Sequence, residues 1–444
     1  METNDPRPPS KLIRHGPGWT VFENLYMSNG TLYIITPDPG EWPDLRYFIS
    51  VPMIALNTPE NIAAREPTPE LISFISRYQA ERLWGDRIWD VKDFTFMVTD
   101  PPQFLNHYYH FVAETFLGLW RMFASLDPKI DAHGKSTLPK LGRIIVPYCS
   151  DDDWVNAGRA PFNQWFLQGV FPSIGIESSR DWNHRVSLTA SPKGLSAFRF
   201  ANVVLSDRSA SFRGNLCPGR TNRIASEAYE VTTSTSSQWW WEPIRQSVLK
   251  LSRVEKSIME RSVMWDGVWK WGLDFVDKNP QTLELALKST PIVISYIVRT
   301  NKRMLRPEDH KELVHGLRQL CASKGWQLNI VHAERMSKDE QVLMAAKTTI
   351  MLGVHGNGLT HLVWMSPSPL STVIEMFYPG GFARDYEWTA RALGHRHYAI
   401  RNDTYATYPN LPDVDYPEGF QGNSIPLYAP TVTKLIEDRL EGRI

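Results

Sequence analysis

The segment Gly353-Val-His-Gly-Asn-Gly-Leu-Thr-His361 connects two apolar runs through a turn rich in glycine. Glycine lets the backbone approach a ligand closely, and a helix that starts at such a turn presents free N–H groups to an anion. The imidazole of His355 adds a hydrogen-bond donor. The residues of this predicted anion site are His355, Gly356, Asn357, Gly358, Leu359 and Thr360. The alternative is a plain strand-to-helix turn in which glycine only avoids strain.

Arg299 ends an apolar strand upstream of this turn, and Arg303 follows four residues later. Guanidinium groups bind a diphosphate in a bidentate manner and keep their charge at all physiological pH values. Both arginines are expected at the same carboxyl edge of a sheet as the His355 turn, which favours an anion site there. The alternative is a solvated basic loop.

Glu375 ends the next apolar strand. A buried carboxylate at that position is suited to accept hydrogen bonds from ribose hydroxyls. The alternative is an ion pair with Arg384 or Arg391.

A second group of chemically active residues lies in the N-terminal half, where His107, His110 and Glu114 are spaced three and four apart. On a helix these residues share one face. We rank three interpretations: His110 or Glu114 as the general base or acceptor-positioning group, then a structural polar cluster, then a metal site. The acidic triplet Asp151–Asp153 is interpreted as a solvated loop rather than a metal site.

The elements that must position these residues follow from hydrophobic patterns. Residues 19 to 36 predict a hairpin with an Asn29-Gly30 turn. Two strands, 93 to 99 and 143 to 149, flank an apolar helix at 106 to 124 and predict a β-α-β unit, and 201 to 206 predicts a further strand. In the C-terminal half five short strands alternate with helices, which predicts a doubly wound parallel sheet. The fold class is therefore α/β.

The predicted domain boundaries follow from these elements and from a Thr- and Ser-rich stretch at 232 to 238. They are a flexible tail at 1–20, an N-terminal α/β domain at 21–231, a linker at 232–245, a C-terminal α/β domain at 246–428 and a C-terminal helix at 429–444.

The amino-acid composition limits the classes of binding partner that are expected. Forty-eight basic residues match forty-eight acidic ones, so no global field favours nucleic acid. The three cysteines fit no zinc spacing and no disulfide framework, although one bridge between Cys149 and Cys217 stays open. The chain contains seventeen tryptophans. For those at 239–241, 265, 269 and 271, packing between domains is favoured over a sugar-binding platform.

Together these residues resemble glycosyltransferase family 61, which includes the EGF-domain O-linked N-acetylglucosamine transferase and plant β-1,2-xylosyltransferases. The likeness rests on the His355 turn, on Arg299 with Arg303, on Val373-Ile-Glu-Met-Phe377, and on His110 with Glu114. The family's turn usually reads His-Gly-Ala-Gly-Leu-Thr-Asn, so this chain departs from it at Asn357 and His361. The spacing from Asn106 to His110 is also one residue longer.

The resemblance implies a GT-B architecture of two Rossmann-like domains and an inverting transfer from a UDP-sugar to a hydroxyl of a glycan or glycoprotein. The C-terminal domain would bind the donor through Arg299, Arg303, Glu375 and the His355 turn. The N-terminal domain would bind the acceptor, and His110 or Glu114 would activate it. No metal would be required, and the donor sugar would be N-acetylglucosamine, xylose or a similar sugar.

Family members work in the secretory lumen, yet the polar N-terminus shows no export signal and no apolar run is long enough to span a membrane. The lumen and the cytosol therefore both stay open as locations. Two alternative functions are an epimerase or another nucleotide-sugar enzyme on the same fold, and a catalytically inactive UDP- or sugar-binding module.

Overall fold

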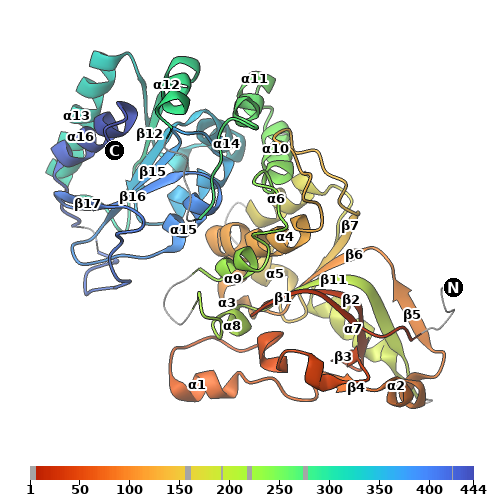
Figure 1. Ribbon diagram of the computed structural model, residues 1–444. Coiled ribbons are helices and arrows are strands. Elements are labelled where there is room, and N and C mark those ends of the chain that lie inside the picture. Colours follow the sequence, from red (N-terminus) through yellow and green to blue (C-terminus); the bar gives the residue numbers. More distant parts are fainter. Residues whose placement is uncertain (1–6, 156–161, 192–193, 218–222, 274–278, 423) are drawn as a thin grey trace. The chain divides into compact units, whose positions relative to one another are not determined.

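The computed structural model describes residues 7–155, 162–191, 194–217, 223–273, 279–422 and 424–444. The chain forms two compact units (Figure 1). Unit 1 consists of residues 1–129, 137–220 and 224–237, and unit 2 of residues 130–136, 221–223 and 238–444. The main boundary, after Ser237, falls inside the predicted linker. None of the described helices is both long and apolar enough to cross a membrane.

Among the described residues, unit 1 contains a nine-stranded mixed sheet of order β4-β3-β2-β11-β6-β7-β8, with β1 paired to β2 and β5 to β11. The strands are β1 Lys11–Gly16, β2 Trp19–Ser28, β3 Thr31–Ile35, β4 Ile72–Ile75, β5 Ile88–Val91, β6 Phe94–Val98, β7 Leu141–Ile145, β8 Gly175–Glu177 and β11 Ala197–Ser206. A separate small ribbon pairs β9 Ala190–Ser191 with β10 Gly194–Leu195.

The α-helices of unit 1 are α1 Pro59–Ala64, α2 Arg77–Trp84, α3 Pro102–Leu105, α4 Leu117–Ala124, α5 Asp151–Val155, α6 Phe162–Val170, α7 Ser179–Thr189, α8 Arg208–Ser211 and α9 Ala225–Glu230. Two short 3₁₀ turns are η1 Pro39–Glu41 and η2 Leu45–Tyr47, and a π-helix, η3 His110–Phe116, runs directly into α4.

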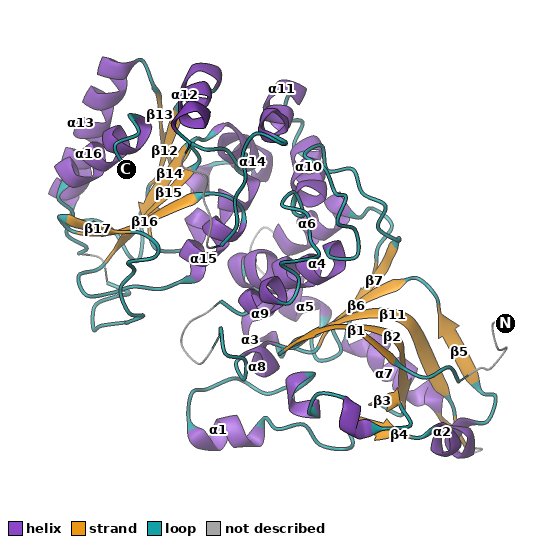
Figure 2. Cartoon of the chain, viewed as in Figure 1, coloured by secondary structure: helices purple, strands orange, loops and turns teal. Residues whose placement is uncertain are grey.

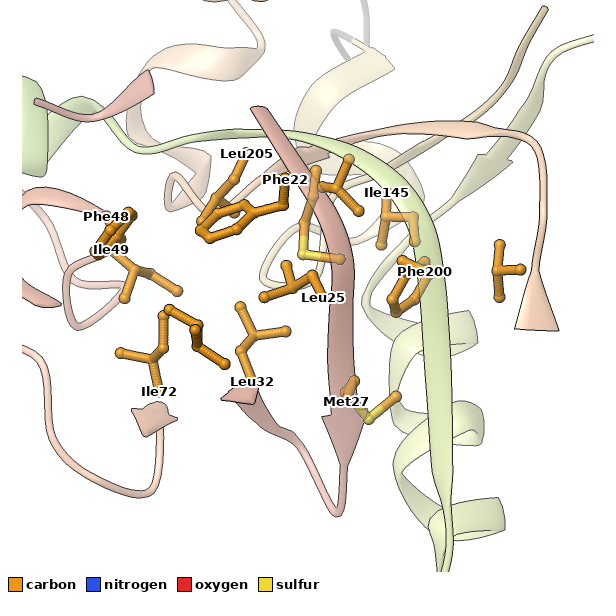
Figure 3. Close-up of a cluster of buried hydrophobic side chains, with 14 of the residues drawn as sticks. Phe22, Leu25, Met27, Leu32, Phe48, Ile49, Ile72, Ile145, Phe200 and Leu205 are labelled. Carbon is orange, nitrogen blue, oxygen red and sulfur yellow. The ribbon is translucent and has the colours of Figure 1, made fainter. Parts of the chain in front are cut away.

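Two predictions for unit 1 hold. Asn29 and Gly30 both have positive φ, 49° and 85°, as a tight hairpin turn requires. Strands β6 and β7 are parallel and flank the helix formed by η3 and α4, which confirms the β-α-β unit. The core of the unit gathers apolar side chains mainly from β2, β3 and β11 (Figure 3).

Two other predictions need correction. The flexible tail is wrong from Lys11 onward, because Lys11–Gly16 forms β1 and pairs antiparallel with β2. This strand has six residues and few buried side chains, so it gives little hydrophobic signal. Only its pairing with β2 identifies it as a strand. The sheet is also less Rossmann-like than predicted, since β2 pairs antiparallel with both β3 and β11.

Unit 2 contains the predicted doubly wound sheet (Figure 2). Its strands are β12 Val293–Ile297, β13 Gln327–Val331, β14 Ile350–Val354, β15 Thr372–Phe377, β16 Arg396–Arg401 and β17 Thr404–Ala406. The order is β13-β12-β14-β15-β16-β17, and all pairs are parallel except the last. Of the five predicted strands, all five are present as β12 to β16.

Helices cover both faces of this sheet. They are α10 Glu242–Leu251, α11 Lys256–Met259, η5 Glu260–Trp265, α12 Pro280–Ser289, α13 Pro307–Lys324, η6 Ala333–Arg335, α14 Lys338–Lys347, η7 Asn357–Trp364, α15 Asp385–Ala392 and α16 Ala429–Leu440. The helix α13 packs against α16, whereas α14 and α15 pack against η7. The predicted stop signals hold, since Gly325 ends α13 with φ 69° and Ser337 with Glu340 forms a capping box on α14.

Candidate active site

The topology of unit 2 brings the predicted anion-binding residues to one place. Numbered along the chain, the five parallel strands have the order 2-1-3-4-5, so the winding direction reverses between β12 and β14. In open α/β sheets the carboxyl ends of the strands at such a reversal form a ligand-binding crevice. Arg299 follows the end of β12 and His355 follows the end of β14. The two segments therefore meet at the switch point of the sheet.

Arg299 and Gly356 are in direct contact there. A Cβ built on Gly356 would overlap the guanidinium of Arg299 and would lie 3.4 Å from Nη1 of Arg303. The backbone of Gly356 is also at φ 145°, which a side chain would strain. Burial first, and then the charge of Arg303, lower the pKa of Arg299. Glycine at this position therefore leaves room for the guanidinium at the turn.

Arg303 approaches the same turn from the other end of the loop. Its Nη1 donates to the carbonyl oxygen of His355 at 3.2 Å, and its backbone has φ 59°, which non-glycine residues rarely adopt. Its Nε is buried and has no hydrogen-bond partner among the described residues. Two guanidinium groups thus converge on one turn with no carboxylate bound to either of them in the described part of the chain, which is what an anion site needs.

The predicted helix follows the turn. Asn357–Trp364 forms it as a 3₁₀-helix, η7. Asn357 is exposed and its Oδ1 accepts a hydrogen bond from Thr360 Oγ1 at 2.9 Å. Leu359 is buried, and Gly358 lies so close to Ile297 that a Cβ there would be 2.8 Å from Ile297 Cγ2. The tight turn therefore packs on β12.

Glu375 joins two histidines instead of an arginine. Its Oε1 lies 2.5 Å from Nδ1 of His355, and its Oε2 lies 2.8 Å from Nε2 of His397. The alternative pairing with Arg384 or Arg391 is wrong, because both of those arginines lie against Glu387. The side chain of Glu375 is fully buried, so both of its oxygens are used inside the protein.

The charge state of this chain of residues follows from its burial. Burial and the nearby Asp385 and Glu387 raise the pKa of Glu375 well above its usual value, against the opposing charge of Arg303. Burial also lowers the pKa of His397 to about 3, so this histidine is neutral. The arrangement fixes the orientation of the His355 ring, which also packs against Phe377 at a centroid distance of 5.4 Å.

In unit 1 the predicted helix face is assembled as well. Nδ1 of His110 lies 2.6 Å from Oε2 of Glu114, and the rings of His107 and His110 are 4.8 Å apart. Glu114 is 2% exposed, whereas the side chain of His110 is 23% exposed. A substrate can therefore reach His110 but not Glu114. Among the described residues no group of three His, Cys, Asp or Glu side chains is placed to hold a metal ion.

The network around Glu114 includes two residues that sequence reasoning missed. Nη2 of Arg208 donates to Oε2 of Glu114 at 2.8 Å, and Nε of Arg208 lies 3.7 Å from Oδ2 of Asp100. Burial favours the neutral form of Glu114, but Arg208 and His110 outweigh it, so the pKa of Glu114 is lowered. Glu114 is therefore a carboxylate that orients His110.

The sequence pattern could have indicated Asp100 and Arg208. Asp100 follows β6 and Arg208 follows β11, and both strands were predicted. Because β6 and β11 are parallel neighbours, their carboxyl ends lie side by side. The rule that placed Arg299 beside His355 would also have placed Arg208 beside Asp100.

The helix face that carries His110 begins as a π-helix. His110 is the first residue of η3, His110–Phe116, and Glu114 lies within it. Such π-turns occur frequently at functional sites. His110 and Glu114 are in contact along this helix.

Three other predicted features are structural. Asp151–Asp153 opens α5, where Asp153 accepts hydrogen bonds from Ser150, so the predicted loop is a helix start. His361 is buried and bonded to Gln341, and burial lowers its pKa to about 4. Cys149, Cys217 and Cys321 are buried and form no disulfide in the described part of the chain, so no bridge links the first two.

The tryptophans at 239–241, 265 and 269 are buried within unit 2. The indole of Trp241 stacks on Trp364 and its Nε1 donates to the carbonyl of Val363, both in η7. Trp269 stacks on Trp271 at a centroid distance of 4.6 Å. These contacts lie within unit 2, and the packing of this group between domains stays a prediction.

Comparison with known protein families identifies the family of this chain. The model of the family Glycosyltransferase 61 matches residues 108–374, more than half of the chain. The chain belongs to glycosyltransferase family 61. The matched range contains His110, Glu114, Arg208, Arg299 and the His355 turn, and Glu375 follows directly after it. A search of curated proteins found no match.

Family membership makes this chain a glycosyltransferase with a sugar donor and an acceptor as its substrates. This result favours the transferase over the epimerase and over the inactive binding module. Each unit contains one cluster of candidate functional residues, the His110–Glu114 pair in unit 1 and the Arg299–His355 turn in unit 2.

Proposed function

We propose that this family 61 member is an inverting, metal-independent glycosyltransferase that moves a sugar such as N-acetylglucosamine or xylose from a UDP-sugar to a hydroxyl of a glycan or glycoprotein. The observation that carries the proposal is the convergence of Arg299 and Arg303 on the His355 turn at the switch point. We also propose that the two units are the two domains of a GT-B enzyme, as the family resemblance implies.

The donor diphosphate would bind at this turn in unit 2. Arg299 and Arg303 would neutralise the charge that develops on the leaving UDP, which is the role a metal ion plays in other transferases. The N–H groups at the start of η7 and the His355 ring would donate to phosphate oxygens. Glu375 would act on His355 as a positioning residue, because both of its oxygens already bind histidines.

The acceptor would be activated by His110 in unit 1. Its Nδ1 faces Glu114, which leaves Nε2 as the atom that takes the acceptor proton. The hydroxyl oxygen then attacks the anomeric carbon, the bond from that carbon to the UDP oxygen breaks, and the configuration inverts. Glu114 would hold the imidazole orientation and stabilise the imidazolium, as the carboxylate does in other base dyads.

The donor assignment is tested by thermal unfolding with UDP, UDP-N-acetylglucosamine, UDP-xylose and GDP-mannose, each with and without EDTA. A ligand present at one hundred times its dissociation constant should stabilise the protein by about 2.7 kcal/mol. We expect stabilisation by UDP and one UDP-sugar, no effect of EDTA, and loss in Arg299→Ala but not in Arg318→Ala, an exposed position on α13. If no nucleotide stabilises the chain, the donor site is wrong.

The base assignment is tested by turnover. His110→Ala and Glu114→Ala should both lose activity while UDP still stabilises the protein. Product NMR should show the inverted anomeric configuration and transfer only when an acceptor is present, whereas an epimerase would need no acceptor. Intact turnover in the double alanine variant would exclude both residues.

We further propose that the enzyme works in the secretory lumen, as family members do. Asn29 lies exposed at the tip of the β2–β3 hairpin in an Asn-Gly-Thr sequon. Expression in the native cell type should yield a protein whose mass falls on peptide N-glycosidase treatment. A chain without this modification and found in the cytosol would contradict the location.

A further inference from the structure

Unit 2 has a cavity at the opposite ends of the sheet strands from Arg299 and His355. Its volume is about 370 Å³, in the range of small-molecule sites. Ser371 precedes β15 and Arg396 begins β16, so the cavity lies at the amino ends of these strands. The donor turn lies at the carboxyl ends of the neighbouring strands.

Two arginines in the wall of this cavity have no acidic partner among the residues that the structure describes. Arg439, on α16, is 8% exposed, and its only hydrogen bond among the described residues goes from Nη2 to the carbonyl oxygen of Pro369. Its Nε is buried without a partner in that part of the chain. Arg396 likewise makes no side-chain hydrogen bond or ion pair with the described residues. In contrast, Arg391 in the same wall is paired with Glu387.

The positive charge of Arg439 favours an anionic ligand. Its side chain is buried, whereas that of Arg396 is partly buried. A buried charge without an ionic partner is costly, because burial removes its hydration. Burial lowers the pKa of Arg439 and the charge of Arg396 lowers it further, yet arginine stays protonated in proteins. The third cationic candidate, His395, adds no charge, because burial lowers its pKa to about 3. The cavity therefore carries two positive charges that the described residues do not balance.

The remaining wall suits a compact polar molecule. Ser368 and Thr407 contribute hydroxyl groups, and Trp271 and Tyr408 contribute aromatic surface. A Cβ built on Gly272 meets no atom of the described residues within 4 Å. Hydroxyl groups and aromatic edges beside arginines are the elements that recognise a sugar ring bearing an acidic group.

We propose that this cavity binds an acidic sugar, with its carboxylate or phosphate between Arg396 and Arg439. The site is separate from the donor turn and does not depend on the UDP-sugar assignment. The acid can belong to a uronic acid or to a sugar phosphate, and the experiment distinguishes these two sources.

The test is calorimetric titration of the full chain carrying Arg299→Ala, which removes the predicted donor site. The probes are glucuronate, glucose 6-phosphate, inorganic phosphate and neutral glucose. We expect glucuronate or glucose 6-phosphate to bind and glucose not to bind. Arg396→Gln should weaken that binding at least about tenfold, because it removes a charged hydrogen-bond donor. The matched Arg318→Gln, on exposed α13, should leave it unchanged.

A second variant leaves both arginines in place. Gly272→Leu fills the open space at the wall and should block the acidic sugar without a loss in melting temperature. Binding of glucuronate alone identifies a uronic acid, and binding of glucose 6-phosphate alone identifies a phosphate. The proposal is overturned if neither binds, if glucose or bare phosphate binds equally well, or if Arg396→Gln and Gly272→Leu both bind normally.

Discussion

Arg208 contacts two carboxylates at once and lies over the ring of Phe104, with its Cζ 4.5 Å from the centroid. A lysine ammonium is a single point charge and cannot reproduce this planar, multivalent contact. We expect Arg208→Lys to lower kcat roughly tenfold or more, since general base catalysis contributes at least about a hundredfold. The KM for the donor and the Kd for UDP should stay unchanged. Initial rates at saturating donor, together with UDP titration, measure both quantities.

Arg199→Lys is the matched control, because Arg199 also binds a carboxylate with two nitrogens, that of Asp90, but lies outside this network. Its kcat should equal that of the unchanged chain. An Arg208→Lys enzyme with normal kcat would show that Glu114 orients His110 without help.

Asp100 gives the protein a pH dependence of known sign. Burial raises the pKa of Asp100 to about 7, against the opposing charge of Arg208. The unfolded chain releases this proton near pH 4, so between about pH 4 and pH 7 the folded state holds a proton that the unfolded state has lost. The free energy of unfolding therefore falls as the pH rises through this window.

Asp100→Asn removes this proton. Chemical denaturation at pH 5, 6 and 7 should show that the unchanged chain loses stability relative to the variant by up to about 1.4 kcal/mol per pH unit. A constant difference across these pH values would mean that Asp100 does not titrate in this range.

Gly356 should matter for the ligand more than for the fold. The atom that a Cβ would overlap is the end of a flexible arginine side chain, which can move away. Gly356→Ala should therefore displace Arg299 and weaken UDP binding about tenfold, the loss expected for a charged hydrogen bond. Gly267→Ala is the control, because Gly267 also has positive φ, 71°, but meets no atom within 4 Å. Equal UDP affinity in the Gly356→Ala and Gly267→Ala variants would show that Arg299 does not bind the donor.

At the scale of elements, the two halves of the chain differ in how far the sequence predicts them. The strands of unit 2 are short apolar runs with clear helix caps between them, such as the Ser337 box and Gly325, so their order could be read directly. Their parallel pairing then placed Arg299 beside His355. In unit 1, β1 shows no clear apolar pattern, and the antiparallel pairing of β2 with β11 joins segments about 180 residues apart. Local patterns do not contain such contacts.

A close contact with β2 is among those that hold the helix carrying His110 on the sheet. This helix continues into α4, where a Cβ on Gly118 would overlap the six-membered ring of Trp19 in β2. Gly118→Ala should therefore destabilise unit 1 by about 1–3 kcal/mol, because the ring fills the space and must shift. Trp19→Phe makes room, so the two substitutions together should cost less than the sum of their separate costs. Chemical denaturation of the unchanged chain, the two single variants and the double variant measures the coupling energy. Strict additivity of the changes in unfolding free energy would mean that the helix does not rest on Trp19.

At the scale of the whole molecule, each unit has its own sheet and its own buried core. The charged groups also fall into separate networks, one around Arg208 and one around Glu375. The partners of Glu375 could not be predicted, because His397 reaches it only through the pairing of β15 with β16. Units with separate cores can unfold as separate cooperative steps.

We therefore expect calorimetry of the full chain to show two unfolding transitions. Gly118→Ala should lower the transition temperature of unit 1 by several degrees and leave the transition temperature of unit 2 unchanged. UDP should raise only the transition temperature of unit 2. Arg299→Ala should abolish that rise and leave the effect of Gly118→Ala on unit 1 unchanged. A single transition that both Gly118→Ala and UDP displace would show that the two cores unfold as one, in which case the effects of variants in one unit would have to be measured on the whole chain.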